Sequence, residues 1–141
     1  MNIGICTAVW GDYHKYLPQW AQSIAGQTMP PKEVHICIAG NGYEANLARV
    51  REVLPNVKIT EKEYDSPAGM RNSAVDPLET EWVMFMDADD ELLPHCIEMC
   101  SKVKGADVIS LGYRRKINGT VETKERLYSR MRGIDALKAP I

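Results

Sequence analysis

The chain has 141 residues, of which 45% are hydrophobic and 26% are charged, a composition typical of one soluble globular domain. Seventeen basic against nineteen acidic residues give a net charge of -2, which disfavours nucleic-acid binding because no basic excess can neutralise a phosphate backbone. The four cysteines fit reduced thiols, and neither a signal peptide nor a membrane-spanning segment is recognisable. We therefore expect a cytoplasmic protein with no membrane span.

Strand-like and helix-like segments alternate along most of the chain. Apolar runs predict strands at Ile3–Val9, Glu33–Ala39, Val57–Thr60, Trp82–Met86 and Asp107–Leu111. Helical spacing and capping residues predict helices at Tyr16–Ala25, Tyr43–Leu54, Ser66–Ala74, Pro94–Val103 and Leu127–Leu137. Asn118-Gly119 predicts the two-residue turn of a hairpin. The alternation predicts one α/β domain over residues 1–141, with a mainly parallel sheet in which Trp82–Met86 is a central strand.

Three carboxylates follow the most apolar run, at Asp87, Asp89 and Asp90. Open parallel sheets bind ligands outside the carboxyl ends of their strands, so this is where a ligand is expected. In an extended segment Asp87 and Asp89 would face the same side and could share a Mg²⁺ or Mn²⁺ ion, whereas Asp90 would cap the next helix. The alternative is a solvated acidic turn with a helix cap.

Four blocks of sequence resemble, in order, the nucleotide-sugar-binding half of a family 2 glycosyltransferase with the Rossmann-like, three-layer GT-A fold. They are Ile3–Thr7, the stretch from Tyr16-Leu17 through Ser23-Ile24 and Gln27 to Pro30-Pro31-x-Glu33-Val34, Ala68–Ala74 (AGMRNSA), and Trp82–Pro94 (WVMFMDADDELLP). The resemblance implies sugar transfer from a nucleoside-diphosphate sugar, with a UDP-sugar as the expected donor, to an unknown acceptor hydroxyl with inversion.

The resemblance also implies roles for single residues. Asp87 and Asp89 would hold Mn²⁺ or Mg²⁺ against the donor diphosphate, and Asp87 would also lie near the ribose. Arg71 would position the diphosphate or brace the carboxylates, with an ordinary ion pair as the alternative. Ala8, Trp10 and Asn41 would line the base and ribose pocket, although Trp10 suits a core or lid role equally well. The Ala39–Gly42 turn carries no carboxylate where family members usually have acidic residues.

The general base of inverting members is an aspartate well downstream of the metal motif, where it deprotonates the acceptor hydroxyl. Asp135 is the default candidate because it is the only aspartate after Asp107. By this resemblance we expect the acceptor-binding half of the family to be short or lacking in this chain. The alternative function is therefore a non-catalytic nucleotide-sugar-binding or interaction module derived from a glycosyltransferase, and a homodimer is one assembly that either function allows.

Two other groups of residues have competing interpretations. Cys96 and Cys100, beside His95, have a spacing that would allow zinc binding, but packing in the core is favoured because the same helix face is apolar. The basic residues of the last third would attract a phosphate-bearing acceptor or donor, or form a solvated face; they include Arg114-Arg115-Lys116, Arg126, Arg130 and Arg132.

Overall fold

The computed structural model describes residues 1–124 and 130–131, and the chain divides into two compact units, Met1–Ser101 and Lys102–Ile141. The elements of the first unit, in chain order, are β1 (Ile3–Val9), the 3-10 helix η1 (Tyr13–Tyr16), α1 (Leu17–Ala25), β2 (Glu33–Ile38), α2 (Glu44–Val53), β3 (Lys58–Glu61), α3 (Pro67–Val75), β4 (Trp82–Phe85) and α4 (Cys96–Ser101). Within the described residues, no helix has the length and apolar character needed to span a bilayer.

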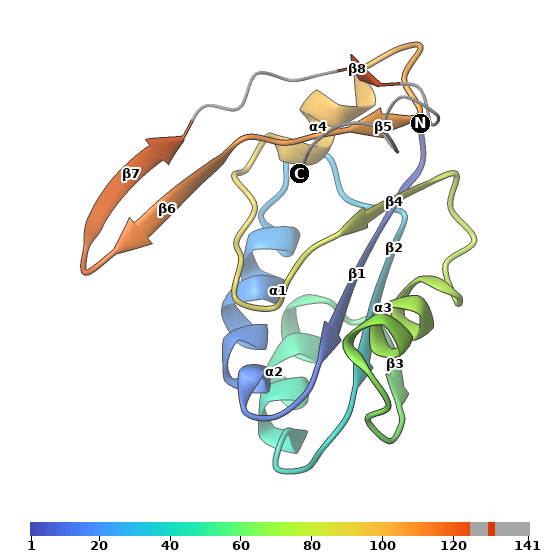
Figure 1. Ribbon diagram of the computed structural model, residues 1–141, viewed down its shortest axis with the longest axis vertical. Helices are drawn as coiled ribbons and strands as arrows, with labels where there is room; N and C mark the ends of the chain where they lie inside the picture. Colours follow the sequence, from blue (N-terminus) through green and yellow to red (C-terminus); the bar gives the residue numbers. More distant parts are fainter. Residues whose placement is uncertain (125–129, 132–141) are drawn as a thin grey trace. The chain divides into compact units, whose positions relative to one another are not determined.

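The four strands of the first unit form one parallel sheet in the order β3-β2-β1-β4. In Figure 1, α1 and α2 lie on one side of this sheet and α3 lies on the other, which gives three layers. The predicted α/β class and the parallel sheet are therefore confirmed. Because all four strands run in the same direction, the loops that leave their carboxyl ends meet at one edge of the sheet.

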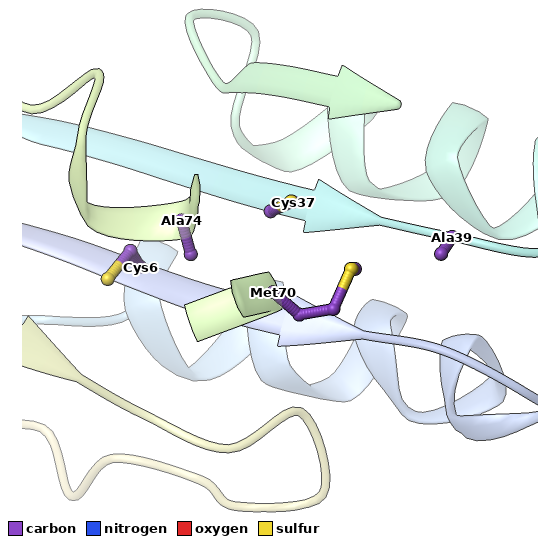
Figure 2. Close-up of a cluster of buried hydrophobic side chains, with 5 residues drawn as sticks. All are labelled: Cys6, Cys37, Ala39, Met70 and Ala74. Carbon is purple, nitrogen blue, oxygen red and sulfur yellow. The ribbon is translucent and has the colours of Figure 1, made fainter. Parts of the chain in front are cut away.

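The two faces of the sheet carry side chains of different size. The face beneath α3 presents small residues, Cys6, Cys37 and Ala39, which form a buried cluster with Met70 and Ala74 of α3 (Figure 2). Side chains alternate between faces along a strand, so large branched residues such as Ile5, Ile36 and Ile38 occupy the opposite face. The small residues leave room for α3 to pack on this face of the sheet.

His35 is fully buried and links three elements of the fold. Its Nδ1 lies 2.5 Å from the carbonyl oxygen of Ala74, and its Nε2 lies 2.9 Å from the hydroxyl of Thr60. The ring therefore joins β2 to the end of α3 and to β3, and both of its buried nitrogens have a hydrogen-bond partner.

Among the residues that the structure describes, β4 lies at the edge of the sheet and not at its centre. Within residues 1–124 and 130–131 it pairs only with β1, and Val83 and Phe85 are 41% and 37% exposed. The prediction that Trp82–Met86 is a central strand is therefore wrong for the described sheet. An apolar run indicates that a strand can be buried, but it does not indicate which strands lie beside it.

The second unit contains β5 (Val108–Ile109), β6 (Tyr113–Ile117), β7 (Thr120–Lys124) and β8 (Arg130–Met131). The hairpin of β6 and β7 is confirmed, with positive φ values of 47° at Asn118 and 81° at Gly119, as a two-residue turn of this kind requires. The helix predicted at Leu127–Leu137 is wrong at residues 130–131, which pair with β5 as an antiparallel strand. The rest of that range lies outside the described residues.

Candidate functional site

The carboxyl edge of the parallel sheet brings four loops together. Trp10 follows β1, Asn41 follows β2, Tyr64 follows β3 and Asp87 follows β4. Backbone hydrogen bonds continue past the strands, from Ala39 N–H to the Val9 carbonyl at 2.9 Å and from Met86 N–H to the Cys6 carbonyl at 3.0 Å. These bonds fix the starting points of the loops, so the edge is built on a rigid base.

Two aromatic rings meet at this edge. The centroids of Trp10 and Tyr64 are 5.5 Å apart and their planes are tilted by 48°. Trp10 is half-buried and packs on the cluster beneath α3, whereas Tyr64 is 49% exposed. Since β1 and β3 flank β2 in the sheet, this contact crosses the end of β2. Part of the Trp10 ring is therefore structural, and the exposed Tyr64 ring offers an aromatic surface next to it.

The loop after β2 depends on glycine. Gly40 has φ of 106° and Gly42 has φ of 74°, a region that residues with a Cβ rarely adopt. A Cβ at Gly40 would lie 4.0 Å from the backbone nitrogen of Gly11, so the loops after β1 and β2 run close together. Asn41, between the two glycines, is exposed, and Ala8 is half-buried against the cluster beneath α3. The amide of Asn41 is thus free to face a ligand.

The start of α3 is fixed by its cap. The Ser66 hydroxyl accepts a hydrogen bond from Gly69 N–H at 2.9 Å, and Pro67 occupies the first helical position. Met70 and Ala74 are buried against the sheet, so Arg71, one position later than Met70, is turned outward. Its guanidinium lies 5.7 Å from the centre of the Phe85 ring, and its Nη2 lies 3.7 Å from Oδ1 of Asp87. Arg71 therefore links α3 to the end of β4.

The three carboxylates form a turn and not an extended segment. Asp90 N–H donates to the Asp87 carbonyl at 3.1 Å, and Ala88 is buried between the exposed Asp87 and Asp89. Asp90 does not cap α4, because that helix begins at Cys96. Desolvation of the carboxyl group, followed by the negative charges of Asp89 and Asp87, raises the pKa of Asp90 above its ordinary value. The turn concentrates negative charge, and Arg71 is its one ion-pair partner among the described residues.

The segment after the turn is held by Ser23 of α1 and by Gln27 and Thr28, which follow this helix. Gln27 donates from Nε2 to the Leu93 carbonyl at 2.8 Å and accepts at Oε1 from Ile97 N–H at 3.1 Å. The Ser23 hydroxyl accepts from Leu92 N–H at 3.1 Å, and Thr28 N–H donates to the Pro94 carbonyl at 2.8 Å. The acidic turn is therefore anchored before it by the β1–β4 pairing, and after it by α1 and the two residues that follow Gly26.

A cluster of three or more His, Cys, Asp or Glu side chains able to hold a metal ion does not occur in the part of the chain that the structure describes. This finding gives no support to the zinc interpretation of Cys96, Cys100 and His95. It is compatible with a Mg²⁺ or Mn²⁺ site of two carboxylates, because such ions complete their coordination with water and substrate phosphates. Asp135 lies outside the described residues.

Two residues at this edge escaped the sequence reasoning. Tyr64 contacts Trp10, and Phe85 lies beneath the guanidinium of Arg71. A signal for Tyr64 was available, because every residue that follows a strand of a parallel sheet falls at the same edge. No comparable signal marks Phe85, whose exposure depends on the position of β4 in the sheet.

Comparison with known proteins assigns the chain to a family. No curated protein matches it by sequence. The S. aureus protein TarS, as residues 1–349 in complex with UDP, is similar with 21% identity and a TM-score of 0.59, over 72% of this chain and 31% of that one. A longer TarS structure is similar with 22% identity and a TM-score of 0.60, over 72% of this chain and 19% of that one. The chain thus spans less than a third of the TarS chains.

The likeness to TarS confirms the GT-A-like fold that the sequence predicted. A second comparison concerns the sequence itself, since the family described as Glycosyl transferase family 2 matches residues 5–138, which is nearly the whole chain. The chain belongs to glycosyl transferase family 2.

Proposed function

We propose that the chain transfers a sugar from a nucleoside-diphosphate sugar to an acceptor hydroxyl, with inversion and with the help of a divalent cation. One observation carries the proposal. The aromatic pair of Trp10 and Tyr64 and the acidic turn that begins at Asp87 lie at the same edge of one parallel sheet, in a member of glycosyl transferase family 2. A nucleoside diphosphate has a flat base at one end and two phosphates at the other, so its chemistry matches both features.

The aromatic side of the edge suits the nucleoside. Tyr64 exposes a ring beside Trp10, and stacking on such rings is favourable for any base. Asn41 carries both a donor and an acceptor, which can pair with the edge of a base or with a ribose hydroxyl. TarS binds UDP in its crystal structure, which supports a UDP-sugar as the donor.

The acidic side suits a cation and a diphosphate. Desolvation first, and then the negative charges of Asp89 and Asp87, raise the pKa of Asp90. A divalent cation would relieve the repulsion among the three carboxylates. Asp89 and Asp87 would hold Mn²⁺ or Mg²⁺, which when bound would offset the charge that develops on the departing nucleoside diphosphate. Arg71, already within 3.7 Å of Asp87, would orient the carboxylate or pair with a phosphate oxygen.

The acceptor hydroxyl needs a general base as it attacks the anomeric carbon. Asp135 is proposed for this role on the sequence alone, because no other aspartate follows Asp107. Replacement of Asp135 with Asn should therefore abolish transfer and leave nucleotide binding unchanged.

Calorimetric titration with UDP and with GDP, each with Mn²⁺ and with EDTA, tests the donor site. We expect UDP to bind with Mn²⁺ and to bind far more weakly with EDTA. Even the outer partners of metal ligands contribute roughly 10- to 100-fold to metal affinity, so Asp89→Asn should weaken Mn²⁺-dependent binding at least that much. Glu52→Gln, which removes one exposed carboxylate from α2, is the matched control and should bind as the wild type does.

The proposed site would be contradicted if the wild type and Asp89→Asn bound UDP with equal affinity, or if the affinity of the wild type for UDP were the same with Mn²⁺ and with EDTA. Release of UDP from a panel of UDP-sugars then separates the two functions that the sequence allows. Turnover supports a transferase, whereas tight binding with no release of UDP supports a binding module.

A further inference from the structure

The two units of the chain carry opposite charge. Residues 1–101 contain 15 acidic and seven basic residues, whereas residues 102–141 contain ten basic and four acidic residues. The overall charge of -2 conceals this division. The proposed donor site lies wholly in the acidic unit, so it gives no reason for the basic charge of the other unit.

The hairpin of β6 and β7 displays part of that basic charge. Every described side chain from Gly112 to Val121 is exposed, including those of Arg114, Arg115 and Lys116. Three apolar side chains are exposed among them, Tyr113 at 47%, Ile117 at 40% and Val121 at 56%. An isolated two-stranded hairpin is marginally stable in water, so apolar residues on it favour a partner that covers them.

The register of the hairpin distributes both kinds of side chain over both faces. Tyr113, Arg115 and Ile117 alternate in β6 and share one face. Arg114 and Lys116 take the other face together with Val121, because Val121 is the cross-strand partner of Lys116. Each face of the hairpin therefore presents cations next to an apolar side chain.

We propose that the β6–β7 hairpin binds the surface of an anionic phospholipid bilayer. The headgroups supply phosphate and carboxylate oxygens for the cations, and the boundary with the acyl chains accepts tyrosine and aliphatic side chains at the same depth. A protein patch would cover one face of the hairpin and leave the apolar residues of the other in water. A bilayer interface surrounds an inserted hairpin and covers both faces.

Flotation with vesicles tests this proposal on the full chain. We expect binding to phosphatidylcholine vesicles that contain 30% phosphatidylserine and little binding to phosphatidylcholine alone. Raising the salt from about 50 to 300 mM should release the protein, because the Debye length falls and the charges are screened. Failure to float with phosphatidylserine vesicles at low salt, or equal binding to both kinds of vesicle, would overturn the proposal.

Two sets of variants locate the surface. Each cation near an anionic bilayer contributes roughly fivefold to binding, so the triple change Arg114→Gln, Arg115→Gln and Lys116→Gln should weaken it roughly 100-fold. The matched control changes three exposed cations of the acidic unit, Lys32→Gln, Arg49→Gln and Arg51→Gln. The two triple variants have the same net charge, so an equal loss of binding in both would overturn the assignment to the hairpin.

A second pair of measurements tests the apolar part. Ile117→Ser with Val121→Ser should weaken vesicle binding at every salt concentration and leave the salt dependence unchanged, with circular dichroism to verify the fold. Soluble polyphosphate provides the competing outcome. If it binds the wild type, loses binding in the hairpin triple variant, and vesicles do not bind, then the surface recognises a soluble polyanion and the bilayer proposal is wrong.

Discussion

The strands β2 and β4 deliver residues to the same edge of one sheet, yet their surroundings are opposite. β2 lies between β1 and β3, and its residues from Val34 onward are buried. β4 pairs with β1 alone among the described residues, exposes Val83 and Phe85, and leads directly into the acidic turn. The buried strand ends in a neutral glycine turn, and the edge strand ends in three carboxylates.

The different burial of β2 and β4 suggests that the residues around β2 contribute mainly to stability and the residues after β4 mainly to ligand binding. A charge placed within β2 would have to be desolvated at considerable cost, because its residues from Val34 onward are buried. The carboxylates of Asp87 and Asp89 after β4 are exposed to water, where a cation and a ligand would replace that water. Substitutions around β2 should therefore lower the free energy of unfolding. Substitutions in the acidic turn should change ligand binding and leave unfolding nearly unchanged.

The strongest test of this separation is Met70→Ala. Met70 of α3 is fully buried against β1 and β2. Its truncation leaves a cavity and should therefore lower the free energy of unfolding by about 2–5 kcal/mol. Met99→Ala removes the same side chain where it is 51% exposed and should change stability by less than about 0.5 kcal/mol. Urea unfolding measures both, and equal losses would mean that the cluster beneath α3 is not tightly packed.

Alkaline pH should lower the free energy of unfolding through Cys6, which is buried in the cluster beneath α3. Burial raises the pKa of the Cys6 thiol to about 12, so the folded chain keeps a proton that the unfolded chain loses near pH 9. The unfolded state then binds fewer protons, and the contribution of Cys6 to the free energy of unfolding falls by up to about 1.4 kcal/mol for each pH unit between those values. Cys6→Ala should have a shallower dependence of unfolding on pH, and identical slopes would contradict the assignment.

The smallest expected change in stability belongs to the acidic turn. Asp89→Asn removes one of three crowded negative charges, so without metal the free energy of unfolding should stay within about 0.5 kcal/mol of the wild type or rise slightly. Mn²⁺ with UDP should raise the unfolding temperature of the wild type more than that of the variant. A loss of stability above about 1 kcal/mol in the variant without metal would show that the turn itself depends on this carboxylate.

Local patterns predicted most of the elements of the first unit. Short apolar runs predicted the strands, and the Ser66-Pro67 pair located the start of α3 to the residue. The Asn118-Gly119 turn was equally readable, because its backbone requirement is local. The sequence patterns did not predict which strands pair with one another. The edge position of β4 and the strand at residues 130–131 depend on pairing between distant segments, which periodicity within one segment does not encode.

The candidate site divides in the same way. The position of Asp87 and Asp89 at the end of a strand was predictable, because carboxylates directly after an apolar run stand out in the sequence, whereas their metal-binding role stays a prediction. The contact of Trp10 with Tyr64 joins two loops on either side of β2, and the ion pair of Arg71 with Asp87 joins a helix to a strand end. Such contacts depend on strand order and on the distance between layers. Asp135 stays a prediction from sequence, since it lies outside the described residues.

The hydrogen bonds that Ser23, Gln27 and Thr28 make to the segment after the acidic turn have a consequence for entropy. Residues 91–95 belong to no helix or strand, so a free chain here would have to be ordered each time a ligand bound. Because Ser23 of α1 and the residues just after this helix hold the segment, it is ordered when the protein folds. The amide protons of Leu92 and Ile97 should accordingly exchange slowly with solvent deuterium. A substitution that removes these hydrogen bonds should weaken ligand affinity, although the substituted residue itself would not contact the ligand.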